Sequence, residues 1–130
     1  MRDRNVGALC DDYVVRARRH LPVAVVEVDD DLALARRWPA DGETIALEPS
    51  GESWTTGQLA RCLEDRMTRG TRNLTFAIGG ADGLPASLVA RATSRLSLSP
   101  LTLPHRLARL ILCEQIYRAL TIIRHEPYHH

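Results

Sequence analysis

The sequence contains no lysine, a single phenylalanine and only three cysteines among its 130 residues. Cys10, Cys62 and Cys113 lie far apart, which fits neither a disulfide framework nor a zinc knuckle, so we interpret them as small core residues. No apolar run approaches the roughly 18 residues of a membrane span, and no apolar signal segment opens the chain. We therefore expect a soluble, cytoplasmic protein without metal, folded as one domain over residues 1–130.

Charge is nearly balanced overall, at +1, but it is unevenly distributed along the chain. Residues 1–60 contain 7 arginines and 11 acidic residues, whereas residues 61–130 contain 10 arginines and 5 acidic residues. The basic second half is compatible with a polyanionic partner, and the forked guanidinium of arginine is well suited to phosphate. A solvated arginine surface is the structural alternative.

Hydrophobic periodicity predicts alternating helices and short strands. We expect helices at residues 7–20, 56–67, 85–93 and 104–124, and strands at residues 23–28, 44–47, 73–78 and 96–103. One of the acidic residues 29–31 could begin a further short helix that runs through Arg37. The 23–28 segment is almost continuously apolar, which is typical of a strand covered on both faces. Pro100 is expected to bend or interrupt the last strand. The order of elements predicts an α/β fold with a largely parallel sheet.

The loops that follow the strands are the candidate ligand site, because ligands of parallel sheets bind beyond the carboxyl ends of the strands. These are the loops after Leu47, after Ile78 and around Ser99. The glycine-rich loop 79–83 matches neither the dinucleotide fingerprint nor the phosphate-binding loop. A tight turn is therefore its structural alternative.

Two polar residues of the last predicted helix invite a functional interpretation. His105 begins this helix, where the helix dipole disfavours a protonated imidazole; a bond to nearby backbone is the alternative. Glu114 lies on the apolar stripe, where a carboxylate needs a partner. Arg118 could pair with it one turn later, or Glu114 belongs to an active site or a subunit interface. No hydrolase motif accompanies them.

Three segments of the second half occur in a distinctive order. They are FAIGGADGL at 76–84, LSLSPLTLPH at 96–105, and EQIYRA at 114–119, the last continuing to PYH at 127–129. These motifs closely resemble the RlmH family of small bacterial SPOUT-class methyltransferases, which methylate N3 of a pseudouridine in large-subunit ribosomal RNA. The resemblance covers about the last two thirds of the chain.

The resemblance implies a parallel-sheet α/β fold with a C-terminal trefoil knot, a homodimer, S-adenosylmethionine as the cofactor, and ribosomal RNA on the ribosome as the partner. Carried over position by position, the cofactor would be enclosed by Leu47, Gly80, Leu98, Ser99, Pro100, Leu101, Thr102 and Leu103. The matched catalytic candidates are His105, Glu114, Tyr128 and His129. RNA phosphates would be held by arginines of the basic half, with Arg109 and Arg118 as candidates.

The chain also departs from the family pattern. It lacks the strand that opens the family fold, its segment 29–42 is shorter, and it ends at His130 where relatives commonly carry another basic residue. Two alternatives to an active enzyme of the family therefore stay open. One is a catalytically inactive knotted dimer that binds RNA or ribosomes, and the other is a SPOUT methyltransferase with a different RNA target.

Overall fold

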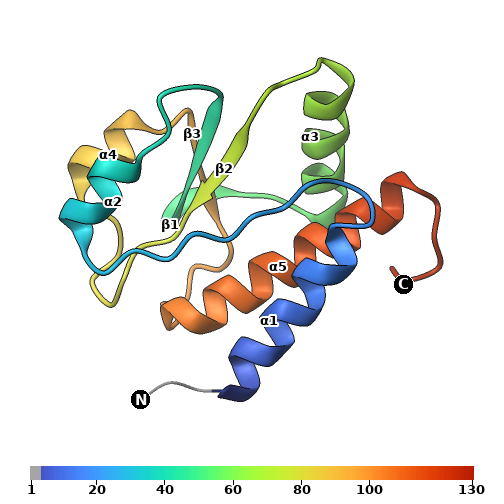
Figure 1. Cartoon of the computed structure of the whole chain (residues 1–130), viewed down its shortest axis with the longest axis horizontal. Helices are drawn as coiled ribbons and strands as arrows, with labels where there is room; N and C mark the ends of the chain where they lie inside the picture. The colour runs from blue at the N-terminus through green and yellow to red at the C-terminus, as the bar shows by residue number, and fades with distance from the viewer. Residues whose placement is uncertain (1–3) are drawn as a thin grey trace.

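A parallel sheet with helices packed around it forms the centre of the protein in the computed structural model, which describes residues 4–130 (Figure 1). In chain order the elements are α1 (Arg4–Ala17), α2 (Asp31–Arg37), β1 (Glu43–Ser53), α3 (Thr56–Thr68), β2 (Leu74–Ala77), α4 (Ala86–Arg91), β3 (Ser94–Ser97) and α5 (His105–Ile123). The predicted α/β class with a parallel sheet is confirmed. The trefoil knot stays a prediction.

The sheet has the strand order β2-β1-β3, and both pairs are parallel. Ala46 of β1 lies opposite Ala77 of β2, and Leu47 lies opposite Leu96 of β3. Leu96 pairs a second time, with Glu52, because the register between β1 and β3 shifts between Leu47 and Glu52. The carboxyl end of β2 therefore lies beside Ala46 in the middle of β1, whereas Ser97 at the carboxyl end of β3 lies opposite Ser53, the last residue of β1. The sequence places the candidate site at the ends of these strands.

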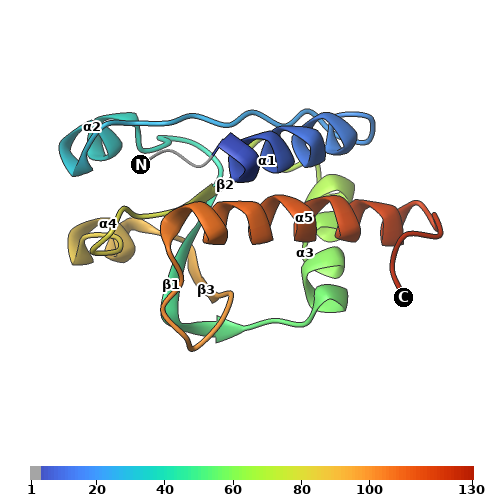
Figure 2. The same ribbon diagram turned by 90° about the horizontal axis from the view of Figure 1, so that it is seen from below.

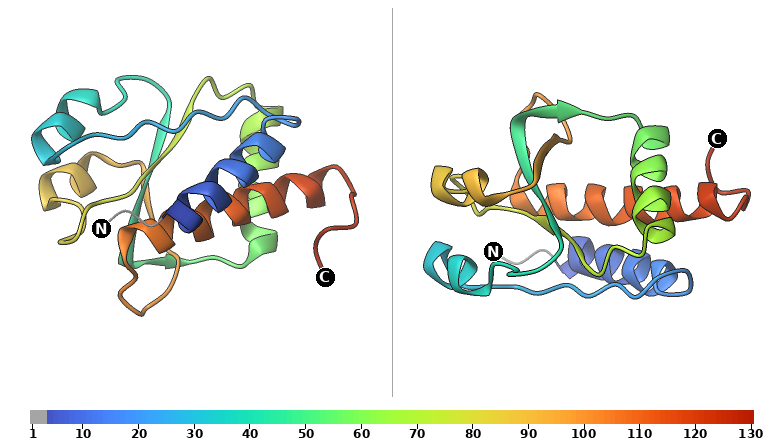
Figure 3. Two further views of the ribbon diagram at one scale, coloured as in Figure 1. Left: turned by 60° about the horizontal axis from the view of Figure 1, so that its bottom comes forward. Right: turned by 90° about the horizontal axis from the view of Figure 1, so that it is seen from above.

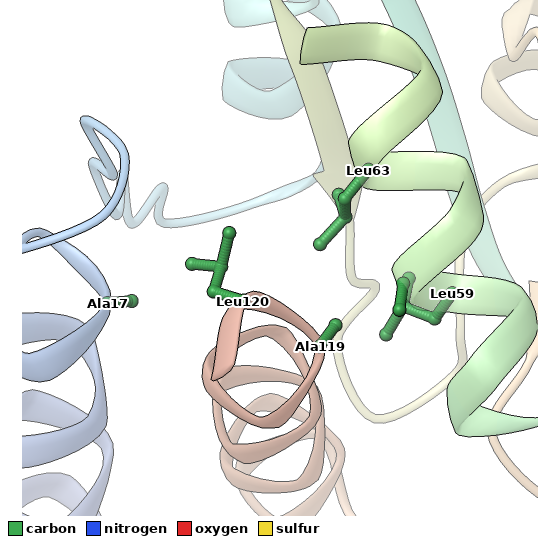
Figure 4. Packing of buried hydrophobic residues seen from close by; sticks show 6 residues of the cluster. Ala17, Leu59, Leu63, Ala119 and Leu120 are labelled. Carbon is green, nitrogen blue, oxygen red and sulfur yellow. The ribbon is translucent and has the colours of Figure 1, made fainter. Parts of the chain in front are cut away.

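The larger core cluster joins three helices to β2. Its buried members are Ala17, Leu59, Ala60, Leu63, Ala119 and Leu120. Figure 4 shows α5 between α1 and α3, with Leu120 directed between its neighbours, and Figures 2 and 3 show α5 running along α1. The alanines allow close helix approach, while truncation of a buried leucine such as Leu120 to alanine costs about 2–5 kcal/mol of stability. This cluster fixes the position of α5, which carries most of the candidate polar residues.

A smaller cluster holds α2 and α4 against the end of β2. It contains Trp38, Ala77 and Leu88, all buried, and the two short helices lie together in Figure 1. The helix α2 begins as its acidic sequence predicts, because the Asp30 carboxylate accepts a hydrogen bond of 2.8 Å from the Ala33 N–H. The cluster supports the loop that follows β2.

Local sequence signals set the ends of α3 and explain why its predicted bounds are nearly right. Thr55 and Gln58 form a reciprocal capping box, in which each side chain accepts a hydrogen bond from the other residue's backbone N–H. Gly70 follows with a φ of 70°, in the left-handed region that favours glycine after a helix. The core interpretation of the cysteines fits Cys10, which is buried, better than Cys62 and Cys113, which are half-buried.

The prediction of a buried strand at 23–28 is wrong. The segment is not part of the sheet, and Val25 and Val26 are 41% and 58% exposed. Its apolar composition suits a strand, but a strand also needs a neighbour that pairs with its backbone N–H and C=O groups. No strand lies beside it among residues 4–130, and side chains hold it instead: Arg18 Nε donates to the Val23 carbonyl oxygen at 2.7 Å, and Glu27 pairs with Arg109.

The predicted strand at 96–103 is wrong beyond Ser97, where β3 ends. Residues 98–104 form a loop, because Pro100 has no backbone N–H to donate and the Ser99 hydroxyl accepts the Leu101 N–H at 2.9 Å, which favours a local turn. Within residues 4–130, no helix is long and apolar enough to cross a membrane. In the same range, no three His, Cys, Asp or Glu side chains are placed to hold a metal ion.

Candidate functional site

The predicted cofactor residues lie on the loops that follow β2 and β3, except Leu47, which lies inside β1. The predicted end of the first strand at Leu47 is wrong, because β1 continues to Ser53. Leu47 and Leu98 are half-buried, while Leu101 is 72% exposed and is a large apolar side chain without cover. Leu47 also lies opposite Leu96, two residues before Leu98. The sheet register therefore brings the first and third predicted loops together.

The glycine-rich loop after β2 is a tight turn, as its structural alternative predicts. The Gly83 N–H donates to the Gly80 carbonyl oxygen at 3.0 Å, and the two residues form an isolated bridge. A Cβ at Gly79 would lie 2.3 Å from the Gly83 carbonyl carbon, whereas a Cβ at Gly80 would meet no atom within 4 Å. The turn thus closes tightly at Gly79 and leaves open space at Gly80, where a ligand can approach the backbone.

The chemistry of these loops fits S-adenosylmethionine. The Leu101 N–H donates to the Ser99 hydroxyl, whereas the N–H groups of Ser99, Thr102 and Leu103 have no backbone partner among the described residues and are free to read the edge of an adenine. Leucine side chains supply an apolar cover. In addition, the Ser97 hydroxyl at the end of β3 is buried and has no hydrogen-bond partner in the part of the chain that the structure describes. An unsatisfied buried polar atom beside free amides and apolar side chains suits a ligand that is partly polar and partly aromatic.

A shallow depression of about 390 Å³ lies next to these loops. It is lined by Glu48, Leu84, Ala86, Val89, Ala90 and Arg95. None of the predicted cofactor residues lines it, although Glu48 follows Leu47 directly. Arg95 and Glu48 form an exposed ion pair of 3.4 Å within this lining. The predicted cofactor loops therefore form an open surface beside the depression and not its lining.

Glu114 is the centre of a hydrogen-bonded cluster on α5. Arg118 Nε and Nη2 donate to its Oε2 at 3.1 and 2.8 Å, and Gln115 Nε2 donates to its Oε1 at 2.9 Å. The Tyr128 hydroxyl donates to Oε2 at 2.9 Å. The i,i+4 pair with Arg118 that the sequence offers as one alternative is thus present, and the residue is at the same time the anchor of the C-terminal tail.

Three tyrosines complete this cluster: Tyr117 of α5, Tyr128 of the tail and Tyr13 of the N-terminal helix α1. The Tyr128 ring packs edge-on against Tyr117 at 4.7 Å between centroids, and the Arg118 guanidinium carbon lies 4.7 Å from the centroid of the Tyr128 ring. The hydroxyl of Tyr13, on α1, lies 3.3 Å from that of Tyr128. The tail is therefore attached to both α5 and α1.

The electrostatics of the cluster keep its two acidic groups in opposite protonation states. Partial burial raises the pKa of Glu114, but the hydrogen bonds from Arg118 and Tyr128 and the charge of Arg118 outweigh it, so the pKa lies below its ordinary value. Burial and the contacts with Tyr13 and Glu114 raise the pKa of Tyr128. At neutral pH Glu114 is therefore a carboxylate and Tyr128 is a neutral phenol.

The two histidine candidates lie in different places. His129 belongs to the tail cluster, where Arg118 Nη1 is 3.3 Å from its Nδ1. An arginine can only donate, so Nδ1 accepts and the proton of the neutral ring is on Nε2. His105 is exposed at the first turn of α5, nine residues before Glu114 and directly after the cofactor loop. The structure therefore brings Glu114, Tyr128 and His129 together and leaves His105 apart.

The two arginines predicted to hold RNA phosphates are both engaged inside the chain. Arg118 binds Glu114, and Arg109 pairs with Glu27 of the extended segment 23–28. The Arg109 Nε atom is buried and has no hydrogen-bond partner among residues 4–130. Both side chains keep part of their surface exposed, about a quarter in each case.

Sequence reasoning missed three residues of these sites. Tyr13 is placed on the packed face of α1, and its hydroxyl would have required a partner in any case. Gln115 links the cluster to α3, because the Thr56 hydroxyl donates to its Oε1 at 2.7 Å. Ser97 has no sequence signal of its own, because only the fold buries its side chain.

Comparison with known proteins places the chain in a family. Residues 1–129 match the family described as "Predicted SPOUT methyltransferase". A protein named ribosomal RNA large subunit methyltransferase H from Sorangium cellulosum is 42% identical over 135 residues, which cover all of this chain and 93% of the relative. A protein of the same name from Gemmatimonas aurantiaca is 41% identical over 133 residues, covering 91% of this chain and 86% of the relative.

These matches confirm the resemblance carried by the three motifs, and they extend it over nearly the whole chain. They agree with the parallel α/β fold and with the position of the motifs on the loops at the sheet edge and on α5. The chain therefore belongs to the SPOUT methyltransferases and, within them, to the RlmH family.

Proposed function

We propose that this protein is a ribosomal RNA methyltransferase that transfers a methyl group from S-adenosylmethionine to N3 of a pseudouridine in large-subunit RNA, acting as a homodimer. The observation that carries the proposal is the gathering of the family motifs at one sheet edge and on α5, in a chain whose relatives bear the name of an RNA methyltransferase.

The cofactor would be held by the loops that follow β2 and β3 and by Leu47 of β1. Leu47, Leu98 and Leu101 cover the adenine, and free backbone N–H groups of residues 98–103 bind its edge. Ser99, Pro100, Thr102 and Leu103 belong to the same loop, and Gly80 lets the ligand approach the backbone closely. When bound, the cofactor supplies an electrophilic methyl group on a sulfonium. The residues of these loops would position this group for transfer to the acceptor nitrogen, and positioning of this kind contributes much of the rate.

The candidate catalytic residues divide by their chemistry. Glu114 is an ionised carboxylate already satisfied by Arg118 and Tyr128, which makes it a poor proton acceptor. Tyr128 keeps its proton, so it too is no base. We assign Glu114 and Tyr128 to positioning of the tail. The imidazoles of His105 and His129 are then the groups that contact the nucleobase. The proton that N3 loses when it accepts the methyl group would pass to the exposed His105 imidazole or to solvent, and His129 acts as a donor through Nε2.

The homodimer is supported by the distance between the two parts of the site. Glu114 follows His105 by nine residues on α5, a separation of about 13 Å along a helix axis. A single chain therefore keeps the tail cluster away from its own cofactor loops, and a second copy would supply the missing part. Large apolar side chains are exposed on the two helices that run together, namely Leu9 and Val15 on α1 and Leu107 and Ile111 on α5.

Arginine side chains of the second half would bind the RNA. Arg61, Arg72 and Arg124 are exposed and make no ion pair among residues 4–130. Arg109 and Arg118 would add phosphate contacts through their exposed surface while they hold Glu27 and Glu114. This electrostatic part of binding is weakened by salt.

Calorimetry with S-adenosylhomocysteine tests the cofactor site, and methyl transfer to ribosomal particles that lack the modification tests the reaction. We expect saturable binding and a methyl group mapped to one pseudouridine. A folded protein that does not bind the ligand would contradict the proposal. Binding without transfer would favour the inactive RNA-binding dimer, and transfer to another nucleotide would favour a different RNA target.

A further inference from the structure

One buried hydroxyl has no role in the fold. The Ser97 side chain ends β3, the residue is 6% exposed, and its Oγ atom has no hydrogen-bond partner among the described residues. Most buried polar side chains in native proteins are hydrogen-bonded, and an unsatisfied one destabilises the folded state. We therefore expect the hydroxyl of Ser97 to have a hydrogen-bond partner from outside the chain.

The position of Ser97 identifies the kind of partner. The six residues that follow it, 98–103, form the predicted cofactor loop, and Leu96 before it lies opposite the predicted cofactor residue Leu47. Ser97 itself pairs with Ser53 of β1. The hydroxyl thus lies at the carboxyl end of β3, where ligands of parallel sheets bind.

Two other hydroxyl groups of the sheet region stabilise the fold through hydrogen bonds to the backbone. The Thr44 hydroxyl is also buried, but it accepts the Thr93 N–H at 3.2 Å, and the Thr93 hydroxyl accepts the Thr44 N–H at 3.0 Å. This pair joins the start of β1 to the residue before β3. Ser97 makes no such link, so the fold alone does not explain its hydroxyl.

We propose that Ser97 is a cofactor-binding residue whose hydroxyl forms a hydrogen bond with a polar atom of bound S-adenosylmethionine. The proposal rests on the proposed function and deepens it, because it adds a residue outside the set that the family motifs assign. In the free protein the hydroxyl contributes an unsatisfied polar group, and on binding it gains its partner. The side chain therefore stabilises the complex and not the free fold.

The test is Ser97→Ala, studied by thermal unfolding without ligand and by calorimetry with S-adenosylhomocysteine. We expect the melting temperature of the free protein to stay the same or rise by about 1–5 °C, because an unsatisfied buried hydroxyl is removed. We expect the dissociation constant to increase about 3- to 10-fold, because one hydrogen bond to the ligand is lost. Ser87→Ala, on the exposed surface of α4, is the matched control and should change neither quantity.

Three outcomes of these measurements would contradict the proposal. A lower melting temperature in Ser97→Ala would show a structural hydroxyl and overturn the proposal. Unchanged affinity would overturn it too, because the ligand would then make no hydrogen bond with the Ser97 hydroxyl. If the unchanged protein does not bind S-adenosylhomocysteine, the proposed function itself fails. If the unchanged protein binds it and Ser97→Ala binds it equally well, only the role of Ser97 fails.

Discussion

The hydroxyl of Tyr128 donates a hydrogen bond of 2.9 Å to the carboxylate of Glu114, fourteen residues earlier in the chain. This bond attaches the C-terminal tail to the middle of α5. Because the acceptor is ionised and half-buried, the bond is stronger than one between neutral groups. The tail therefore occupies a defined place, in which His129 lies next to Arg118.

Replacement of Tyr128 by phenylalanine should loosen this attachment while it keeps the aromatic packing against Tyr117. We expect Tyr128→Phe to lower the free energy of unfolding by about 1–2 kcal/mol, because a hydrogen bond to a charged acceptor is lost. Urea unfolding measures this change, and hydrogen exchange should show faster opening of the last residues. Equal protection in both proteins would contradict the role of the bond.

The cluster should also make stability depend on pH. Because the pKa of Glu114 in the folded protein is below its ordinary value of 4.5, its interactions stabilise the fold fully above that value. They are lost as the pH falls through the lower, folded-state pKa. The unfolding free energy should therefore fall more steeply with acid in the unchanged protein than in Glu114→Gln. If the unfolding free energies of the two proteins ran parallel from pH 7 to pH 3, the interactions of Glu114 would not contribute to the pH dependence of stability.

Tyr13 should support the tail through Tyr128. The Tyr128 hydroxyl has one proton, and the carboxylate of Glu114 is the nearer and stronger acceptor, so the bond of 3.3 Å between the phenols must use the proton of Tyr13. We expect Tyr13→Phe to cost about 0.5–1.5 kcal/mol. Its effect should be smaller in a Tyr128→Phe background, measured as a double-mutant cycle. Fully additive effects would mean that the two phenols act independently.

The adjacent glycines of the turn after β2 should respond in opposite ways. Gly79→Ala should destabilise the fold, because the new Cβ would collide with the backbone of Gly83 and Leu84. Gly80→Ala should leave the melting temperature nearly unchanged, because its Cβ meets open space, but should weaken binding of S-adenosylhomocysteine by filling the approach to the loop. Thermal unfolding and calorimetry on both variants check this pair. A stable Gly79→Ala protein would contradict the tight closure.

Much of the fold can be predicted from local patterns. The period of apolar residues gives the bounds of α3 almost to the residue, and the alternation of strands with helices gives the parallel sheet. The family motifs also direct attention to Gly80, to residues 98–103 and to Glu114. These features depend on neighbours in sequence, which is why sequence reasoning reaches them.

Pairing across the chain is decided only by the tertiary structure. The apolar run at 23–28 has the composition of a buried strand, yet it has no neighbouring strand to satisfy its backbone and remains outside the sheet. Tyr13 and Tyr128 meet across 115 residues, and Ser97 is buried without a partner, both consequences of how α1, α5 and the sheet pack. Composition determines which segments can become helix or strand, whereas the partner of each polar group depends on which surfaces come together in space.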